Sequence, residues 1–321
     1  MANQSLAVKM SESVSLEDQR FLQSYYCTYW FYETLRNEVI GHNPYLSWTE
    51  QAALQSHYPR MLKAAEYPSK LAATIYSNRR AYAIQTIQRS QDPVVFDAGC
   101  GYGSECFLFA SQGAKVIGID LSDEQIEVAR KRQPYYEEIF GKPLDIQFIV
   151  GNLDESISDV NNISLTWLAS VLAAVGDQNK FLERTYEATR GGGQIIVTDM
   201  NLFNPLFLIK EYYRRQQAKS ESIEFALRSD FWAMVKRQGR IGARYFPGNN
   251  GRPFDDVQFF SAKTLSRLLS NVGFTLKSVR FNGFVPPHLW QVGFGPLEDL
   301  LSRTPLLRWF GYFYLCSAMK Q

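Results

Sequence analysis

Residues 94–103 read Val-Val-Phe-Asp-Ala-Gly-Cys-Gly-Tyr-Gly, and residues 115–122 read Lys-Val-Ile-Gly-Ile-Asp-Leu-Ser. The first stretch predicts a short buried strand that runs into a glycine turn, and the second predicts a strand that ends in the carboxylate of Asp120. Glycines let the backbone approach a ligand closely, and an acid about 20 residues beyond such a turn can bind both hydroxyls of a ribose. The segment therefore predicts a nucleotide-binding site in an α/β protein.

The spacing of the glycines separates two classes of nucleotide site. Dinucleotide folds have Gly-x-Gly-x-x-Gly, whereas here the third glycine comes one residue early, at Gly103, and an acid, Asp97, precedes the first glycine by two residues. An acid followed by Gly-x-Gly-x-Gly resembles the first motif of the class I methyltransferases that use S-adenosylmethionine, and Gly118-Ile-Asp-Leu-Ser122 is similar to their second motif. The resemblance is to the bacterial small-molecule methyltransferases, and it covers 94–200 well and 261–320 loosely.

The rest of the chain alternates strand and helix patterns, which predicts a parallel sheet. Further strands are expected at Ile146–Val150, Ser164–Leu168, Gln194–Thr198 and Thr275–Phe281, and a last one at Tyr312–Ser317. A helix is expected from Ser122, which forms a capping box with Gln125, to Pro134. We expect an α/β, Rossmann-like, seven-stranded, mostly parallel sheet with the last strand antiparallel, as the resemblance implies, and helices on both faces.

We expect the chain to be divided into three parts. Residues 1–90 carry apolar positions at helical spacing and predict an N-terminal helical cap, 91–201 with 261–321 form the methyltransferase core, and 202–260 form a helical insertion or substrate lid after strand five.

The resemblance also implies which residues hold S-adenosylmethionine, the expected cofactor. Asp97 would orient its methionine part, the backbone of the glycine turn would approach it, Asp120 would hold the ribose, and Asn152 would accept a hydrogen bond from the adenine amino group. The full set implied for the cofactor is Asp97, Gly99, Cys100, Gly101, Gly103, Asp120, Leu121, Asn152, Leu153, Leu168 and Ala169. Core packing is an equal alternative for Leu168.

Methyl transfer requires an in-line approach of a nucleophile and exclusion of water, so a base is not always needed. If the acceptor is a hydroxyl, His57 and His288 are the candidate catalytic bases, because the resemblance places their segments near the pocket. A structural or surface role is the alternative for each histidine.

The additions to the core suggest the acceptor. Residues 21–60 and 202–260 are rich in aromatic side chains, which favours an apolar pocket for a hydrophobic or lipid-like small molecule. The same aromatics could instead pack the additions onto the core or form a homodimer face. Lys and Arg outnumber acids in 202–260, so this segment could receive an anionic group or form a solvated face.

Net charge, motifs and the spacing of the cysteines argue against several classes of function. A net charge of +2 gives no field for nucleic acid, and the Asn/Asp-Pro-Pro-aromatic sequence of base-methylating relatives is missing after the fourth predicted strand. The four cysteines lack metal-ligand spacing, so no metal site is expected. With neither a signal peptide nor a membrane span visible, we expect a cytoplasmic protein.

Several functions remain open at this point. We expect O-methylation of a hydrophobic small molecule by a metal-independent enzyme. The alternatives are C- or N-methylation, including C-methylation of a prenyl diphosphate, a non-catalytic cofactor-binding protein of the same fold, and a nicotinamide-dependent oxidoreductase.

Overall fold

The computed structural model describes residues 16–58, 69–153, 160–201, 204, 240–244, 254–258, 260–284, 297, 300–301, 304 and 307–321. His288 therefore lies outside the described residues, as does most of the predicted insertion. Within the insertion the structure describes a two-stranded antiparallel sheet of β6 (Arg240–Arg244) and β7 (Phe254–Gln258), and the helices expected there also lie outside the described residues.

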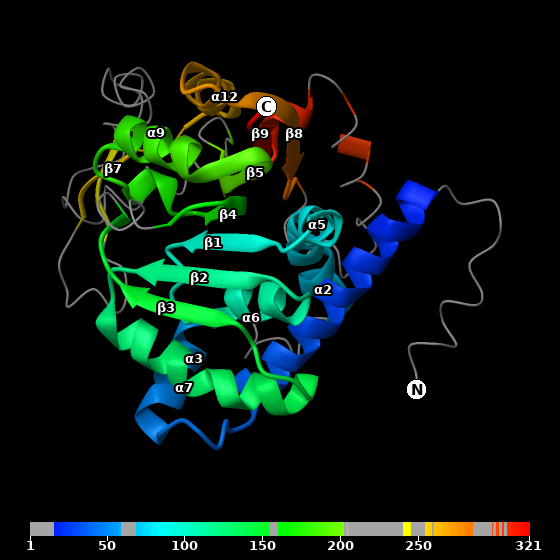
Figure 1. Cartoon of the computed structure of the whole chain (residues 1–321), viewed down its shortest axis with the longest axis vertical. Helices are drawn as coiled ribbons and strands as arrows, with labels where there is room; N and C mark the ends of the chain where they lie inside the picture. The colour runs from blue at the N-terminus through cyan, green and yellow to red at the C-terminus, as the bar shows by residue number, and fades with distance from the viewer. Residues whose placement is uncertain are drawn as a thin grey trace, which may run out of the picture.

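A seven-stranded sheet in the order β3-β2-β1-β4-β5-β9-β8 forms the centre of the protein (Figure 1). Only β9 runs antiparallel to its neighbours among these seven strands. This confirms the predicted sheet. The strands are β1 (Val94–Ala98), β2 (Lys115–Asp120), β3 (Ile146–Val150), β4 (Ile163–Ala169), β5 (Thr189–Met200), β8 (Thr275–Asn282) and β9 (Phe313–Met319).

Helices cover both faces of this sheet, as expected (Figure 1). One face packs against α6 (Ser104–Ser111) and α7 (Asp123–Phe140) in a core that includes Phe107 and Ile126. The other face packs against α9 (Gln178–Ala188) and α12 (Ala262–Asn271) in a second core that includes Phe181 and Leu265. The strands are apolar on both sides for this reason, since a parallel sheet covered by two helical layers offers no wet face.

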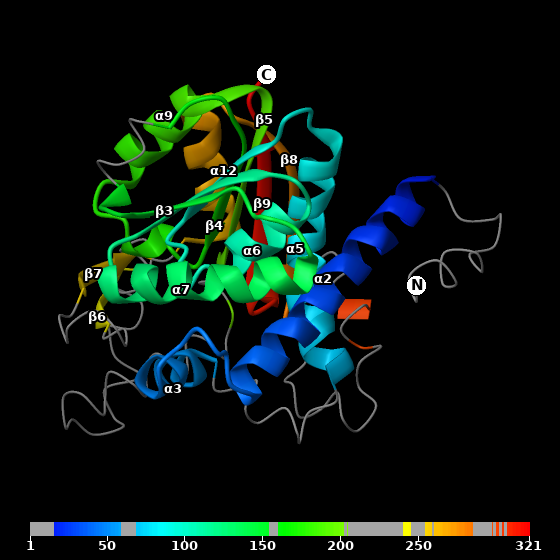
Figure 2. The ribbon, with the colours of Figure 1, turned by 60° about the horizontal axis from the view of Figure 1, so that its bottom comes forward.

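The N-terminal region forms α2 (Leu16–Ile40), α3 (Trp48–His57) and α5 (Ser69–Arg89). Figure 2 shows α2 crossing the layer formed by α5, α6 and α7. Side chains of all three N-terminal helices, among them Leu35, Leu54 and Ile84, belong to the same buried cluster as sheet residues such as Val116. These helices therefore complete the core on one face of the sheet.

The prediction that α7 ends at Pro134 is wrong. The helix continues to Phe140 with Pro134 inside it, and it ends where Gly141 adopts a left-handed conformation with φ 64°. Buried side chains hold the helix on both sides of the proline, Arg132 before it and Tyr136 after it. Tertiary packing thus outweighs the lost backbone hydrogen bond.

None of the helices in the described ranges is both long and apolar enough to span a bilayer. Two short 3-10 turns, Leu172–Ala174 after β4 and Leu307–Phe310 before β9, complete the elements.

The packing of α2 into the core gives a first prediction. Leu35 is 0% exposed, whereas Ile40 on the same helix is 48% exposed. We expect Leu35→Ala to lower the free energy of unfolding by about 2–5 kcal/mol, and Ile40→Ala to lower it by about 0.5 kcal/mol or less. Urea denaturation measures both changes. Equal losses in the two variants would show that α2 does not contribute to the core.

Candidate cofactor site

The glycine turn between β1 and α6 is built from backbone that only glycine adopts without strain. Gly99, Gly101 and Gly103 have φ of 71°, 53° and 76°, in the left-handed region that other residues rarely visit. The space around them is also closed, since a Cβ on Gly99 would lie 2.3 Å from the Val171 side chain and one on Gly103 would lie 2.8 Å from the Phe148 ring. Both the angles and the packing therefore require glycine.

Asp120 ties this turn to the end of β2. Its Oδ2 accepts a hydrogen bond from the amide of Gly101 at 2.8 Å, and its Oδ1 accepts one from the amide of Ser122 at 3.0 Å. Each carboxylate oxygen keeps a further lone pair, so the group can still accept bonds from the two hydroxyls of a ribose. The carboxylate also lines the cavity described below.

Asp97 lies at the carboxyl end of β1 and is almost fully buried. It accepts a weak hydrogen bond from the Cys106 thiol at 3.1 Å. Burial, together with the nearby Glu105 carboxylate, raises the pKa of Asp97 to about 8. A cationic ligand beside this group would favour its ionised form, so the acid is suited to hold the ammonium group of a bound amino acid.

A cavity of about 490 Å³ connects these groups, within the size range of small-molecule and cofactor sites. Most of the predicted cofactor residues line it, namely Asp97, Gly99, Cys100, Gly101, Asp120, Leu121, Asn152, Leu153 and Ala169, and so does His57. Two others do not line it. Gly103 packs under Phe148, and Leu168 is fully buried in the core on the α9 side of the sheet.

The residues around the cavity fit S-adenosylmethionine, because Asp97 could hold the ammonium group of its methionine part and Asp120 the hydroxyls of its ribose. The turn also leaves no room for a side chain at Gly99, and the backbone of Gly99 and Gly101 forms part of the wall. Across the described ranges, no cluster of three or more His, Cys, Asp or Glu side chains is placed to hold a metal ion.

The N-terminal helices add side chains to the cavity that the sequence did not identify. Tyr58 follows α3, and Arg79 and Arg80 come from α5. Arg80 forms a buried ion pair with Glu105 in the first turn of α6, with its Nε 2.9 Å from Oε1. Although burial favours the neutral acid, Arg80 lowers the pKa of Glu105 below its usual value. Two adjacent arginines in α5 were the signal that the sequence offered for this part of the site.

His57 forms part of the cavity wall at the end of α3. Its ring lies edge-on to the rings of Tyr58 and Tyr102, with centroids 4.6 and 4.8 Å away. Burial against neighbouring side chains lowers the pKa of His57, and the carboxylate of Glu105 opposes this only in part. The imidazole is therefore neutral at pH 7 and can accept a proton, and the residue also keeps contact with solvent.

Comparison with known proteins agrees with this geometry. Residues 89–245 match the family model described as a methyltransferase domain. The chain carries a class I, S-adenosylmethionine-dependent methyltransferase domain. The match assigns the glycine turn to this group rather than to the nicotinamide-dependent oxidoreductases.

Three curated relatives match the methyltransferase domain over about 100 residues. The chain is 32% identical over 100 residues to the magnesium-protoporphyrin O-methyltransferase of Rhodobacter capsulatus, covering 30% of this chain and 42% of the relative. It is 26% identical to the arsenite methyltransferase of Rattus norvegicus (33% and 31% covered), and 29% identical to the mitochondrial ubiquinone biosynthesis O-methyltransferase of the same organism (33% and 30% covered). The matched segment spans less than half of each relative.

A solved structure shows the same fold over more of the chain. It belongs to a Listeria monocytogenes protein described as an S-adenosylmethionine-dependent methyltransferase, and the alignment covers 75% of this chain and 97% of that one with a TM-score of 0.50 and 16% identity. At this identity the likeness concerns the fold.

The geometry of the turn predicts how its variants bind. We expect Asp120→Ala and Gly101→Val each to weaken binding of S-adenosylhomocysteine at least tenfold, since the first loses the ribose acceptor and the second strains the turn. Asp145→Ala, which removes an exposed acid outside the cavity, serves as the control and keeps the wild-type affinity. Calorimetry measures all three, and unchanged affinity in both test variants would contradict the site.

The raised pKa of Asp97 predicts a pH dependence of binding. Below about pH 8 Asp97 carries a proton, which it must lose when it pairs with the ammonium group of S-adenosylhomocysteine. The affinity for this ligand should therefore rise by up to tenfold per pH unit from pH 6 and level off near pH 8. Asp97→Asn removes the dependence and lowers the affinity. Calorimetry at several pH values tests this, and an affinity of the wild type that does not change between pH 6 and 8 would refute it.

Replacing Asp97 with asparagine is expected to stabilise the cofactor-free protein. The folded state keeps this proton up to about pH 8, whereas the unfolded chain loses it near the ordinary value of 3.8. The stability of the cofactor-free protein therefore falls as pH rises between these two values. At pH 7.5 we expect Asp97→Asn to raise the free energy of unfolding by about 1–2 kcal/mol, or about 3–6 °C in Tm. A lower Tm in the variant would contradict a protonated Asp97.

Proposed function

We propose that this protein transfers the methyl group of S-adenosylmethionine to a hydroxyl of a hydrophobic, lipid-like small molecule. The observation that carries the proposal is the cavity described above, in which the glycine turn, Asp97 and Asp120 meet apolar and aromatic walls. Tyr58, Trp167, Val171 and Phe313 line it together with Leu121. Most of the exposed wall area is apolar, although Arg79, Arg80 and Glu105 also line the cavity, and such a wall suits a hydrophobic acceptor.

The chain's own residues supply positioning and proton transfer in this mechanism. Bound S-adenosylmethionine contributes an electrophilic methyl group on a positively charged sulfur. Asp97 would hold the methionine part of the cofactor and Asp120 its ribose, and the aromatic walls would exclude water and align the acceptor hydroxyl. Attack of the acceptor oxygen on this methyl group would break the carbon–sulfur bond and release S-adenosylhomocysteine. The neutral His57 accepts the hydroxyl proton.

Two of the matched relatives support O-methylation. The relatives named for magnesium-protoporphyrin and for ubiquinone biosynthesis are both named O-methyltransferases, whereas the arsenite methyltransferase acts on a different class of acceptor. His288 stays a second candidate base.

The first experiment identifies the acceptor directly. The protein is incubated with S-adenosylmethionine labelled in its methyl group and with fractions of a metabolite extract, and the labelled product is analysed by mass spectrometry. A labelled methyl ether or ester in an organic-soluble product supports the proposal. Label on carbon, including in a prenyl diphosphate, or on nitrogen contradicts O-methylation, and binding without turnover would indicate a cofactor-binding protein.

A second experiment tests His57 once a product is known. His57→Phe keeps the ring contacts with Tyr58 and Tyr102 and removes the base, so we expect kcat to fall about 100-fold while the affinity for S-adenosylhomocysteine changes less than twofold. His42→Phe is the matched control, because His42 stacks on Trp48 and does not line the cavity. A His57→Phe variant that keeps more than half of the wild-type kcat would show that positioning alone suffices.

A further inference from the structure

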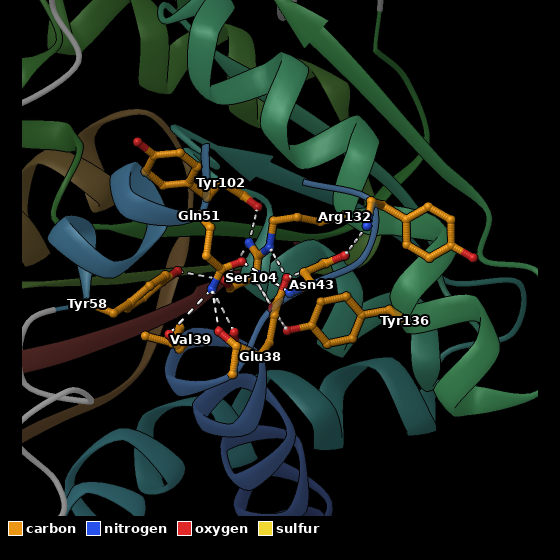
Figure 3. Close-up of polar contacts among 11 residues, drawn as sticks. Glu38, Val39, Asn43, Gln51, Tyr58, Tyr102, Ser104, Arg132 and Tyr136 are labelled. Atoms are coloured by element: carbon orange, nitrogen blue, oxygen red, sulfur yellow. Dashed lines mark hydrogen bonds and ion pairs between the residues drawn. The ribbon is translucent and has the colours of Figure 1, made fainter. Parts of the chain in front are cut away.

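The N-terminal region is linked to the last residues of the cofactor turn and the first residues of α6 at three separate points. The hydroxyl of Tyr58 lies 2.6 Å from Oγ of Ser104, and Arg80 pairs with Glu105. The third point is a buried network around Arg132 of α7, which Figure 3 shows between α2 and the turn. All three end within residues 102–105, although their partners come from different elements.

Arg132 is the centre of this network. Its Nη1 donates to the backbone carbonyl of Tyr102 and, at 3.1 Å, to Oγ of Ser104. Its Nε and Nη2 donate to the two carboxylate oxygens of Glu38 at 2.8 and 2.6 Å. Both side chains are 0% exposed. One guanidinium thus joins α2 to the turn through α7 (Figure 3).

Glu38 is the counter-charge of Arg132 in a site that is closed to solvent. The carboxylate also accepts hydrogen bonds from the hydroxyl of Tyr136 at 2.6 Å and the side-chain amide of Asn43 at 2.8 Å. Burial alone raises the pKa of Glu38, but Arg132, Tyr136 and Asn43 together lower it below its ordinary value. Gln51 of α3 accepts from the backbone amide of Asn43 at 3.2 Å, so α2 and α3 both support the pair.

The turn needs such support because its backbone is intrinsically free. Three of its five residues are glycines, which lose more conformational freedom on ordering than any other residue. The amides of Gly99 and Cys100 bond to the carbonyl of Ile119, and the amide of Gly101 bonds to Asp120. These bonds hold the first half of the turn. Among the described side chains, Arg132 is the one that holds the carbonyl of Tyr102 in its second half.

We propose that Arg132 is a positioning residue for cofactor binding, and that Glu38 of the N-terminal helix α2 is the counter-charge that makes this possible. Neither side chain lines the cavity, so both act through Tyr102 and Ser104. The N-terminal region is therefore part of the cofactor site as well as a wall for the acceptor. The inference rests on the cofactor assignment above.

The test separates loss of positioning from loss of stability. Arg132→Met leaves the buried carboxylate of Glu38 without its counter-charge, and Glu38→Met leaves the buried guanidinium of Arg132 without its own. Both variants should therefore lower Tm. The double variant Glu38→Met/Arg132→Met removes both charges and fills the space with apolar side chains, which commonly restores stability. Tyr136→Phe is the matched control, since it removes two hydrogen bonds of the same network, from Tyr136 to Glu38 and from Arg132 to Tyr136, but no contact with the turn. Thermal unfolding and calorimetry with S-adenosylhomocysteine are measured on each full-length variant.

We expect the double variant to recover most of the Tm lost by the single variants and still to bind S-adenosylhomocysteine at least tenfold more weakly than the wild type. Tyr136→Phe should lose Tm and keep its affinity within twofold. A double variant with wild-type affinity, or a Tyr136→Phe affinity loss as large as that of Arg132→Met, would overturn the proposal.

Amide hydrogen exchange of the turn gives a readout that does not depend on the ligand. Exchange across residues 99–106 should be faster in Arg132→Met than in Tyr136→Phe, and equal rates would also overturn the positioning role. If the wild type itself does not bind S-adenosylhomocysteine, the proposed function fails, and the exchange rates then decide the role of Arg132 alone. If the double variant does not fold, Ser104→Ala replaces it, because it removes the hydroxyl contacted by Arg132 and Tyr58. Its expected loss of affinity is smaller, since Arg132 still holds the carbonyl of Tyr102, and an unchanged affinity would overturn the proposal.

Discussion

A backbone that enters the left-handed region three times in five residues is the constraint on which the rest of the structure depends. The turn at 99–103 must reverse direction between β1 and α6 while leaving its own amides and carbonyls in contact with a ligand. A side chain at Gly99 or Gly103 would collide with Val171 or Phe148. Because glycine alone gives no packing of its own, the surrounding elements have to define the conformation of the turn.

Buried charged side chains help to define the conformation of the turn, and burying a charge costs free energy. Five charged side chains lie within a few residues or two contacts of the turn, namely Asp97, Glu105, Arg80, Glu38 and Arg132. Burial of a single unpaired ion costs several kcal/mol, whereas breaking a buried pair by removing one partner typically costs about 3–5 kcal/mol. The pairs Arg80–Glu105 and Glu38–Arg132 avoid that cost with opposite charges. Asp97 has no such complete pairing and instead keeps its proton, as its pKa of about 8 shows. A cationic ligand supplies the missing charge.

The central sheet was predictable because its signals are local. Short apolar runs gave the strands, including the last one at Phe313–Met319, and the early third glycine with Asp97 indicated the class of cofactor. The end of α7 was not predictable from Pro134, because the contacts of Arg132 and Tyr136 with α2 come from about 95 residues earlier in the chain. The same reason explains why Arg80 and Glu105 were missed in the site, since a pair of residues 25 positions apart has no local pattern. For Leu168 the sequence left the cavity and the core open as equal alternatives, because a doubly covered strand is apolar on both faces and the sequence does not show which face each residue joins. Its side chain lies in the core on the α9 side of the sheet.

The segment that the family resemblance does not cover therefore has two physical tasks in one set of side chains. Tyr58 bonds to Ser104 in the cofactor half of the site, and its ring also lines the cavity. Arg80 holds Glu105 in α6 and also faces the space where an acceptor would lie. A change in these residues that alters the acceptor wall must also alter a contact to the first turn of α6. If the acceptor binds as proposed, its recognition and the geometry of the cofactor site are coupled through the same side chains, and an N-terminal region adapted to another acceptor would have to keep a charge near Glu105 and a counter-charge near Arg132.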